Sequence, residues 1–311
     1  MKDIFYNKRK MIKNNCPICK STNIYVKYSK VTDINFQTTN EFFSLYECKN
    51  CKALFINPLL DEKKLNKYYP ISKYLPFYCS KNIIRTKNIY DPFYIKLKLL
   101  QNIFPKNSKF KLIDLGCGGG YFLYNIKHYF PNADLTGVDS NKNAIISLKS
   151  VGIDGINESI YNLELGKKYD VICAAQVLEH LRKPHIFIKI LKELSNKSSI
   201  FLIDVPNLGS YSAKKFGKNW VHLDVPRHQI NYTYKTLKYL FNDFITVNFY
   251  ICGSHNAIIS SFLLKLGMDI HKNKIFYRIM SNLMYFTYIK NIKSNISKYY
   301  SDKILWFGRK K

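Results

Sequence analysis

The sequence predicts an α/β fold in which a doubly wound sheet follows a small N-terminal module. Two observations predict the sheet. The apolar run Lys111–Leu115 leads into a glycine turn at 116–120 and then into apolar residues at helical spacing. A second short run ends in Asp139. A third observation, two Cys-x-x-Cys pairs near the N-terminus, predicts the separate module.

The two cysteine pairs are the first element along the chain. Cys16 and Cys19 form one pair and Cys48 and Cys51 the other, with 28 residues between them. Four thiolates at this spacing are typical of a structural zinc site. The β-prone residues between the pairs indicate a ribbon of strands that is too short to fold without a metal. We therefore predict a zinc ribbon over residues 1–57; a redox pair or a chance match is the alternative.

Length and composition suggest how the rest of the chain is organised. With 311 residues, 47% of them hydrophobic, the chain can form one large domain and one small one. We predict a Tyr-rich connector or lid at 58–109 and the main domain at 110–311. The sequence shows no secretory signal and no apolar run long enough to span a membrane, so we expect a cytoplasmic protein with reduced thiols.

The formal net charge of +28 points first to a nucleic acid or an anionic membrane. However, 43 of the 49 basic residues are Lys, whereas proteins that bind phosphates bidentately tend to use Arg. Residues 111–252 carry a formal charge of only +5, so the excess lies in the flanking segments. A nucleic-acid partner is therefore not expected.

The glycine turn and Asp139 indicate a nucleoside-containing ligand. Glycines at 116, 118 and 120 allow the backbone to approach a ligand closely, next to the free N–H groups of a helix N-terminus. Asp139 lies 19 residues beyond Gly120, where a ribose diol is bound in dinucleotide-type units. A nicotinamide cofactor is the rival ligand. Asp114 disfavours it, because a carboxylate beside the turn would repel a pyrophosphate and would suit a cationic ligand.

These motifs, with the strand at 169–172, the Leu-Glu-His motif at 178–180 and the strand at 200–205, resemble the class I S-adenosylmethionine-dependent methyltransferases. The resemblance covers roughly residues 110–252 and implies a Rossmann-like, mixed sheet of seven strands. It also implies that S-adenosylmethionine is the cofactor. The cofactor contacts that it implies are Asp114, Gly116, Cys117, Gly118, Gly120, Asp139, Ser140, Glu158, Ser159, Ala175 and Gln176.

The order of the modules resembles a narrower group, the zinc-ribbon methyltransferases. Many of these act on sugars or glycans in bacterial surface-polysaccharide and antibiotic-sugar pathways. The segment from Trp220 to His228 is similar to this group, but the Glu-His pair of its sugar C-methyltransferases reads Arg227-His228 here. The resemblance implies a sugar or glycan acceptor, free or linked to a nucleotide, phosphate or lipid. Loss of the Glu favours O-methylation, with C-methylation as the alternative.

Methylation of a hydroxyl or carbon requires removal of a proton, and histidine is the natural base near neutral pH. We predict that His228, in a loop expected to overhang the cofactor, is the catalytic base; His222 and Asp224 are second candidates. Arg227 is a candidate for holding an anionic acceptor such as a sugar phosphate. The motif at 178–180 is interpreted as orienting or structural. A hydrogen-bonded loop or core residue is the alternative for each histidine.

A long insert, at about 253–302, separates strands predicted at 245–251 and 303–307. It is apolar at helical spacing and carries many Lys residues, so it can lie at the inner membrane face as a peripheral contact. Packing on the core or in a dimer is the favoured alternative, because apolar helical faces usually belong to a core. The oligomeric state stays open.

Two other functions remain as alternatives. An RNA or protein methyltransferase would use the ribbon and the basic flanks to hold its substrate. The Asn/Asp-Pro-Pro-aromatic signature of amino methylation is not found after the fourth strand, where residues 174–177 read Ala-Ala-Gln-Val. A non-catalytic binding protein with the same fold is disfavoured by the intact glycine turn and by Asp139.

Overall fold

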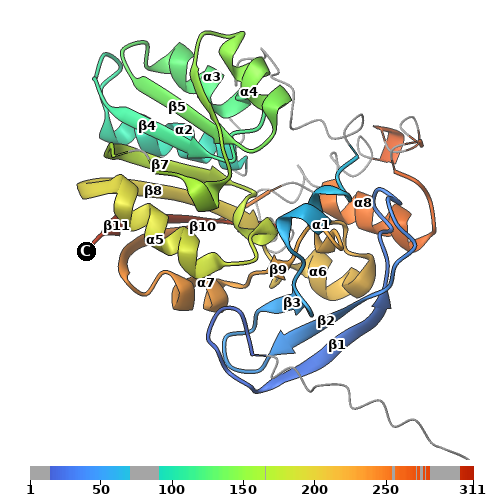
Figure 1. Ribbon diagram of the computed structural model, residues 1–311. Coiled ribbons are helices and arrows are strands. Elements are labelled where there is room, and N and C mark those ends of the chain that lie inside the picture. The colour runs from blue at the N-terminus through green and yellow to red at the C-terminus, as the bar shows by residue number, and fades with distance from the viewer. Residues whose placement is uncertain are drawn as a thin grey trace, which may run out of the picture.

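The computed structural model describes residues 15–70, 91–164, 166–253, 256–270, 272–273, 276, 278–280 and 302–311. These residues form a seven-stranded sheet with helices on both faces and a four-stranded sheet built mainly from the N-terminal residues (Figure 1). Both the doubly wound sheet and a small N-terminal module of strands are confirmed.

The large sheet has the strand order β10-β11-β8-β7-β4-β5-β6. Its first five strands along the chain are mutually parallel, and β11 pairs antiparallel with both β8 and β10. The central strands are buried on both faces, which explains their continuous apolar runs. The strands are β4 (Lys111–Leu115), β5 (Asp134–Asp139), β6 (Asp154–Asn157), β7 (Tyr169–Ala175), β8 (Ser195–Pro206), β10 (Phe244–Cys252) and β11 (Lys303–Lys310).

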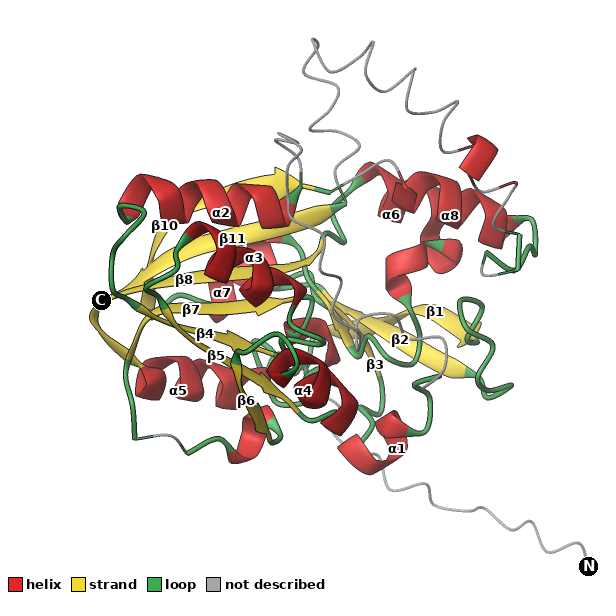
Figure 2. Cartoon of the chain, turned by 90° about the horizontal axis from the view of Figure 1, so that it is seen from above, coloured by secondary structure: helices red, strands yellow, loops and turns green. Residues whose placement is uncertain are grey.

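Helices cover both faces of this sheet and enclose one apolar core on each side. Figure 2 shows α2 and α5 on opposite sides of the strands. Apolar residues of α2, α3 and α4 pack in one core, and those of α5 and α7 pack in the other. Asp91 caps the start of α2, and Thr233 forms a capping box at α7. The helices are α2 (Pro92–Ile103), α3 (Tyr121–Tyr129), α4 (Lys142–Lys149), α5 (Pro184–Leu194) and α7 (Tyr234–Leu240).

The small sheet joins the N-terminal residues to the main part of the chain. It has the order β1-β2-β3-β9, and all of its pairs are antiparallel. Its last strand comes from the segment between β8 and α7, so the two parts of the protein share one sheet. The strands are β1 (Ile24–Val31), β2 (Phe43–Cys48), β3 (Leu54–Ile56) and β9 (Ile230–Asn231).

Short helices surround the small sheet and form a third apolar core with it. They are α1 (Glu62–Asn66), α6 (Tyr211–Phe216) and α8 (Asn256–Lys265), with the 3-10 helices η4 (Gly217–Asn219) and η5 (Val221–Leu223). Two more 3-10 helices, η2 (Ile160–Asn162) and η3 (Leu178–His180), lie beside the large sheet.

The helix α8 belongs to the predicted insert, and it is mostly buried. Ile258, Ile259 and Leu263 are buried, and Ile258 belongs to the third core. This part of the insert therefore packs on the protein, as the favoured alternative expected. Residues 281–301 of the insert lie outside the described residues. Among the residues that the structure describes, every helix is too short or too polar to cross a bilayer.

Candidate active site

A cavity of about 710 Å³ opens at the carboxyl edge of β4, β5 and β7. Parallel strands bring their carboxyl ends to one edge of a sheet, so Asp114, Asp139 and Ala175 meet there although they are far apart in sequence. The predicted cofactor contacts that line the cavity are Asp114, Gly116, Cys117, Gly118, Asp139, Ser140, Ser159, Ala175 and Gln176. Gly120 and Glu158 do not line it.

The glycine turn has the backbone geometry that the sequence suggested. Gly116, Gly118 and Gly120 have φ values of 71°, 53° and 89°, a region that favours glycine. A Cβ at Gly116 would collide with the Val177 side chain, and one at Gly120 with Leu148 of α4. Gly120 therefore serves close packing, whereas Gly116 and Gly118 border the cavity.

Asp139 ends β5 and braces the glycine turn. Its Oδ2 accepts a hydrogen bond from the Gly118 N–H at 2.9 Å, and its Oδ1 accepts one from the Asn141 N–H at 2.8 Å. Burial raises the pKa of Asp139, and these two hydrogen bonds partly offset that effect. Each carboxylate oxygen keeps acceptor capacity for a ligand hydroxyl.

Asp114 belongs to a buried charged group at the floor of the cavity. The Lys96 Nζ of α2 lies 2.6 Å from the Asp204 Oδ1 of β8, and the Gln176 side-chain amide donates to the Asp204 Oδ2 at 2.9 Å. The Asp114 Oδ1 is buried without a hydrogen-bond partner among the described residues. Burial raises the pKa of Asp114 to about 7, and Lys96 opposes this shift. An unpartnered acceptor at the cavity wall fits a ligand that brings a donor or a positive charge.

Lys96 was not among the predicted site residues. It is fully buried, and its ammonium lies 4.8 Å from the ring centroids of Phe93 and Phe122. The sequence does contain a signal for it. Lys96 lies four residues after Pro92 and four before Leu100, on the apolar side of its helix. Because a lysine is almost never fully buried unless it is paired, one on the apolar side of a helix indicates a buried counter-charge.

The remaining wall of the cavity combines apolar side chains, such as Leu65, Ile160 and Leu181, with polar ones from several parts of the chain. The polar residues include Glu62, Tyr69, His180, Arg182 and Gln229. The His180 Nδ1 lies 2.9 Å from the Tyr69 hydroxyl and 3.0 Å from the Arg227 carbonyl oxygen. A hydroxyl-rich or anionic acceptor would find donors and acceptors on this side.

The three predicted catalytic residues lie behind this wall and do not line the cavity. His228 is 7% exposed and packs edge to face against His180, with 4.6 Å between the ring centroids. Burial, reinforced by the charge of His180, lowers the pKa of His228 to about 3. The His222 Nε2 lies 2.7 Å from the Asp302 Oδ2. Asp224 is paired with Arg227.

Arg227 occupies the position of the missing Glu, and it is fully buried. Its guanidinium binds Asp33 and Asp224 and donates to the Tyr68 carbonyl oxygen. These contacts saturate the side chain, so it is not available to an acceptor in the cavity. Glu158 is also engaged elsewhere, because its Oε1 accepts from the Ser159 N–H and from the Asn162 amide.

The four N-terminal cysteines lie together. Their Sγ atoms are all within 4.8 Å of one another; Cys16 and Cys51 are 3.5 Å apart, and Cys19 and Cys48 are 3.4 Å apart. Zn–S bonds of about 2.3 Å place the sulfurs of a tetrahedral site roughly 3.8 Å apart. The cluster therefore fits a four-thiolate metal site. Cys117, Cys173 and Cys252 are buried, as expected for small core residues, and Cys79 lies outside the described residues.

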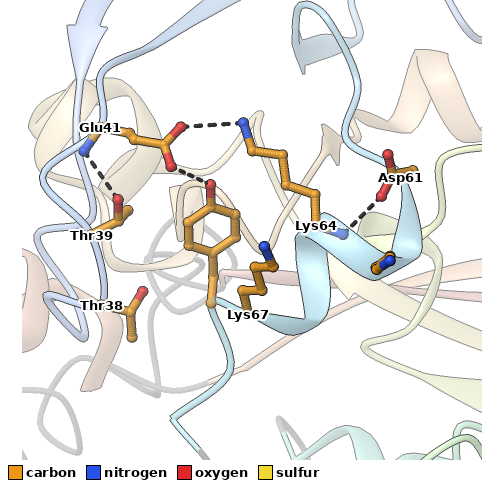
Figure 3. A pocket seen from close by; sticks show the side chains of 8 residues that line it. Thr38, Thr39, Glu41, Asp61, Lys64 and Lys67 are labelled. Carbon is orange, nitrogen blue, oxygen red and sulfur yellow. Dashed lines mark hydrogen bonds and ion pairs between the residues drawn. The ribbon is translucent and has the colours of Figure 1, made fainter.

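A second, shallower hollow of about 430 Å³ lies on the outer side of α1 (Figure 3). One ion pair, between Lys64 and Glu41, lies in it. Glu41 accepts hydrogen bonds from the Lys64 ammonium at 3.2 Å and from the Tyr68 hydroxyl at 2.7 Å, and the Asp61 side chain caps α1. These contacts hold α1 against the loop between β1 and β2. The other face of α1 lines the large cavity through Glu62 and Leu65.

Comparison with known proteins identifies the family. Malonyl-[acyl-carrier protein] O-methyltransferase of Bacillus cytotoxicus is 28% identical over 106 residues, which are 32% of this chain and 37% of that protein. Ubiquinone biosynthesis O-methyltransferase of Pelagibacter ubique is 30% identical over 166 residues, 50% of this chain and 64% of that protein. The chain thus spans less than two thirds of either relative.

Among solved structures, the plantazolicin methyltransferase BpumL aligns with a TM-score of 0.47 at 18% identity, over 82% of this chain and 92% of that one. The model of the family described as Methyltransferase domain matches residues 89–251. Because this match covers more than half of the chain, the protein belongs to the methyltransferase-domain family.

Proposed function

We propose that this protein transfers a methyl group from S-adenosylmethionine to a hydroxyl of a small acceptor, a sugar or glycan precursor. The observation that carries the proposal is the large cavity, which most of the predicted cofactor contacts line together with Tyr69, His180 and Arg182. The acceptor is free or linked to a nucleotide, phosphate or lipid. We place the reaction in the cytoplasm.

The cofactor half of the cavity supports the proposal through its charges. Asp139, beside the backbone of Gly118, would accept the ribose hydroxyls. Asp114, whose Oδ1 has no hydrogen-bond partner among the described residues, would favour the cationic methionine portion. Ser159, which also lines the cavity, would lie by the adenine. When bound, S-adenosylmethionine supplies an already activated methyl group, so the protein's task is to orient the two partners and exclude water.

The acceptor half supports a hydroxyl-bearing substrate. Tyr69 and His180, which contact each other at 2.9 Å, line this side as polar groups, and Arg182 offers a positive charge for a phosphate. The predicted base His228 does not line the cavity, so any action on the acceptor would pass through His180. C-methylation loses support, because Arg227 is held in a buried ion cluster where the related enzymes carry a Glu.

A methyl-transfer screen tests the function. Purified protein and labelled S-adenosylmethionine are incubated with nucleotide sugars, glycan acceptors and RNA. We expect label in a sugar or glycan fraction as an ether that is stable to mild base. Label in RNA, or calorimetry that shows no S-adenosylmethionine binding, would overturn the proposal.

The change Asp139→Ala tests whether this half of the cavity binds the cofactor. It removes an ionised acceptor that also braces Gly118 and Asn141. Hydrogen bonds to a charged group contribute about 1.5–3 kcal/mol, so we expect binding of S-adenosylhomocysteine to weaken roughly tenfold or more. Isothermal titration calorimetry measures this. The control is Asp134→Ala, an exposed carboxylate at the start of the same strand, which should bind like the wild type.

A further inference from the structure

A second cluster of metal-ligand side chains lies at the side of the cavity that His180 lines. Glu179, His180 and His228 each place one ligand atom within 4.8 Å of the other two. They come from η3 and from the loop before β9, so the fold rather than the local sequence assembles them. The cluster shares no residue with the four cysteines.

The Glu179 carboxyl group is the member of this cluster whose burial requires an explanation. The side chain is fully buried, and neither oxygen has a hydrogen-bond partner among the described residues. The nearest ring nitrogen, the His228 Nε2, lies 3.9 Å from its Oε1, beyond hydrogen-bond reach. A buried polar group without a partner costs about 1–3 kcal/mol, and more if it is charged, so it requires an explanation.

Both histidines are anchored in the way that metal ligands usually are. The His228 Nδ1 lies 2.7 Å from the His222 carbonyl oxygen and donates to it, which leaves the Nε2 lone pair directed at the cluster. The His180 Nδ1 lies 3.0 Å from the Arg227 carbonyl oxygen and 2.9 Å from the Tyr69 hydroxyl. A ring N–H that donates to a backbone carbonyl holds the imidazole in one tautomer and orientation, the outer-shell contact that is typical of ligating histidines.

The charges around the cluster also favour a cation. Asp33 and Asp224 share the single guanidinium of Arg227, which leaves one negative charge uncompensated. The Asp224 Oδ2 lies 3.9 Å from the His228 Nε2, on the side of the cluster. An ionised Glu179 would bring the buried excess to two negative charges. A divalent cation would neutralise it.

We propose that Glu179, His180 and His228 bind one divalent transition-metal ion, separate from the four-thiolate site. Two imidazoles and one carboxylate are a ligand set for Zn²⁺, Fe²⁺ or Mn²⁺, and they leave coordination positions open. With metal–ligand bonds of about 2.1 Å, ligand atoms lie roughly 3–4 Å apart, so small side-chain rotations close the site. His180 also lines the cavity, so the ion borders the side where the acceptor is proposed.

Titration of the purified, zinc-loaded protein with Co²⁺ tests this proposal. Cobalt held by imidazole and carboxylate has weak visible bands, whereas cobalt held by thiolates adds an intense near-ultraviolet charge-transfer band. We expect one Co²⁺ per chain with the weak bands alone, together with an increase in the unfolding temperature. This readout is independent of methyl transfer, so its failure would leave the proposed function untouched.

Two variants test whether Glu179 and His228 are metal ligands. Glu179→Gln keeps the shape of the side chain, and His228→Gln removes one imidazole. Because changes to outer-shell partners alone weaken metal binding roughly 10–100-fold, each ligand change should weaken Co²⁺ binding at least that much. The control His222→Gln keeps the backbone carbonyl that anchors His228 and should bind like the wild type.

Glu179→Gln also tests whether misfolding could account for a loss of Co²⁺ binding. It removes a buried carboxylate that has no partner among the described residues, so the variant should be at least as stable as the wild type without added metal. Its unfolding temperature should then fail to rise with Co²⁺. Absence of a second ion, a thiolate charge-transfer band, or equal binding in the wild type and both ligand variants would each overturn the proposal.

Discussion

Replacement of Cys48 by Ser is expected to remove the bound metal and to unfold the N-terminal sheet together with part of the main core. Structural zinc in a four-thiolate site provides about 10–16 kcal/mol of apparent binding free energy, which is as large as the whole stability of an ordinary domain. Cys48 is fully buried within the cluster. Three sulfurs cannot complete the tetrahedron, so most of that free energy is lost.

The loss of structure should extend beyond the N-terminal sheet because the cysteine cluster packs against the main part of the protein. Cys16, Cys48 and Cys51 belong to the same apolar core as the residues of α5 and α7. The Thr236 hydroxyl of α7 donates to the Cys51 carbonyl oxygen at 2.9 Å, and a ring nitrogen of His185 in α5 lies 2.8 Å from the Ile18 carbonyl oxygen. Unfolding around the cysteines would therefore expose buried residues of α5 and α7, the two helices that cover one face of the large sheet.

Zinc content by mass spectrometry and thermal unfolding by circular dichroism measure the effect. Cys117→Ser is the matched control, since it makes the same chemical change at a buried cysteine outside the cluster. It should retain one zinc and lose little stability. A Cys48→Ser protein with full zinc content and the wild-type unfolding temperature would contradict the four-thiolate site.

Replacement of Arg227 by Met is expected to lower the free energy of unfolding by about 3–5 kcal/mol, because it leaves buried carboxylates without their counter-ion. The guanidinium lies 2.7 Å from the Asp33 Oδ1 and 2.8 Å from the Asp224 Oδ1. It also donates to the Tyr68 carbonyl oxygen at 2.9 Å. One side chain thus connects the β1–β2 loop, the segment after α1 and the loop before β9.

Urea unfolding measures this change. Arg309→Met, at an exposed position of β11, is the control and should change stability by less than about 0.5 kcal/mol. Adding Asp33→Asn and Asp224→Asn to Arg227→Met should recover part of the loss, because neutral amides are cheaper to bury than carboxylates. A loss below about 1 kcal/mol in the single variant would show that the ion cluster does not hold these segments together.

The elements that could be predicted from the sequence are those that one contiguous segment determines. The glycine turn at 116–120 has a local backbone requirement, and Asp139 is placed by the end of its own strand. Buried strands such as β8 are apolar over most of their buried length, with Asp204 as the exception at residues 200–205. Each cysteine pair lies on its own short turn, although the antiparallel pairing of β1 and β2 is what brings the two pairs together. The turns and strand ends each have their physical cause within a few residues of themselves.

Other features depend on contacts between distant parts of the chain. Lys96 pairs with Asp204, 108 residues away, and Arg227 pairs with Asp33, 194 residues away. His180 and the predicted base His228 also come from different segments of the chain, and nothing in either segment indicates that His180 lines the cavity while His228 packs behind it.

The sequence alone therefore determined the fold class, the glycine turn and Asp139 at the cavity, and the two cysteine pairs, because periodicity and turn chemistry are local. Only the tertiary structure decided which charged side chains are buried together and which histidine lines the cavity. Burial depends on what packs against a residue, and here those neighbours come from the N-terminal sheet and the connector. The orphaned carboxyl of Glu179 arises in the same way, where η3 meets the loop before β9.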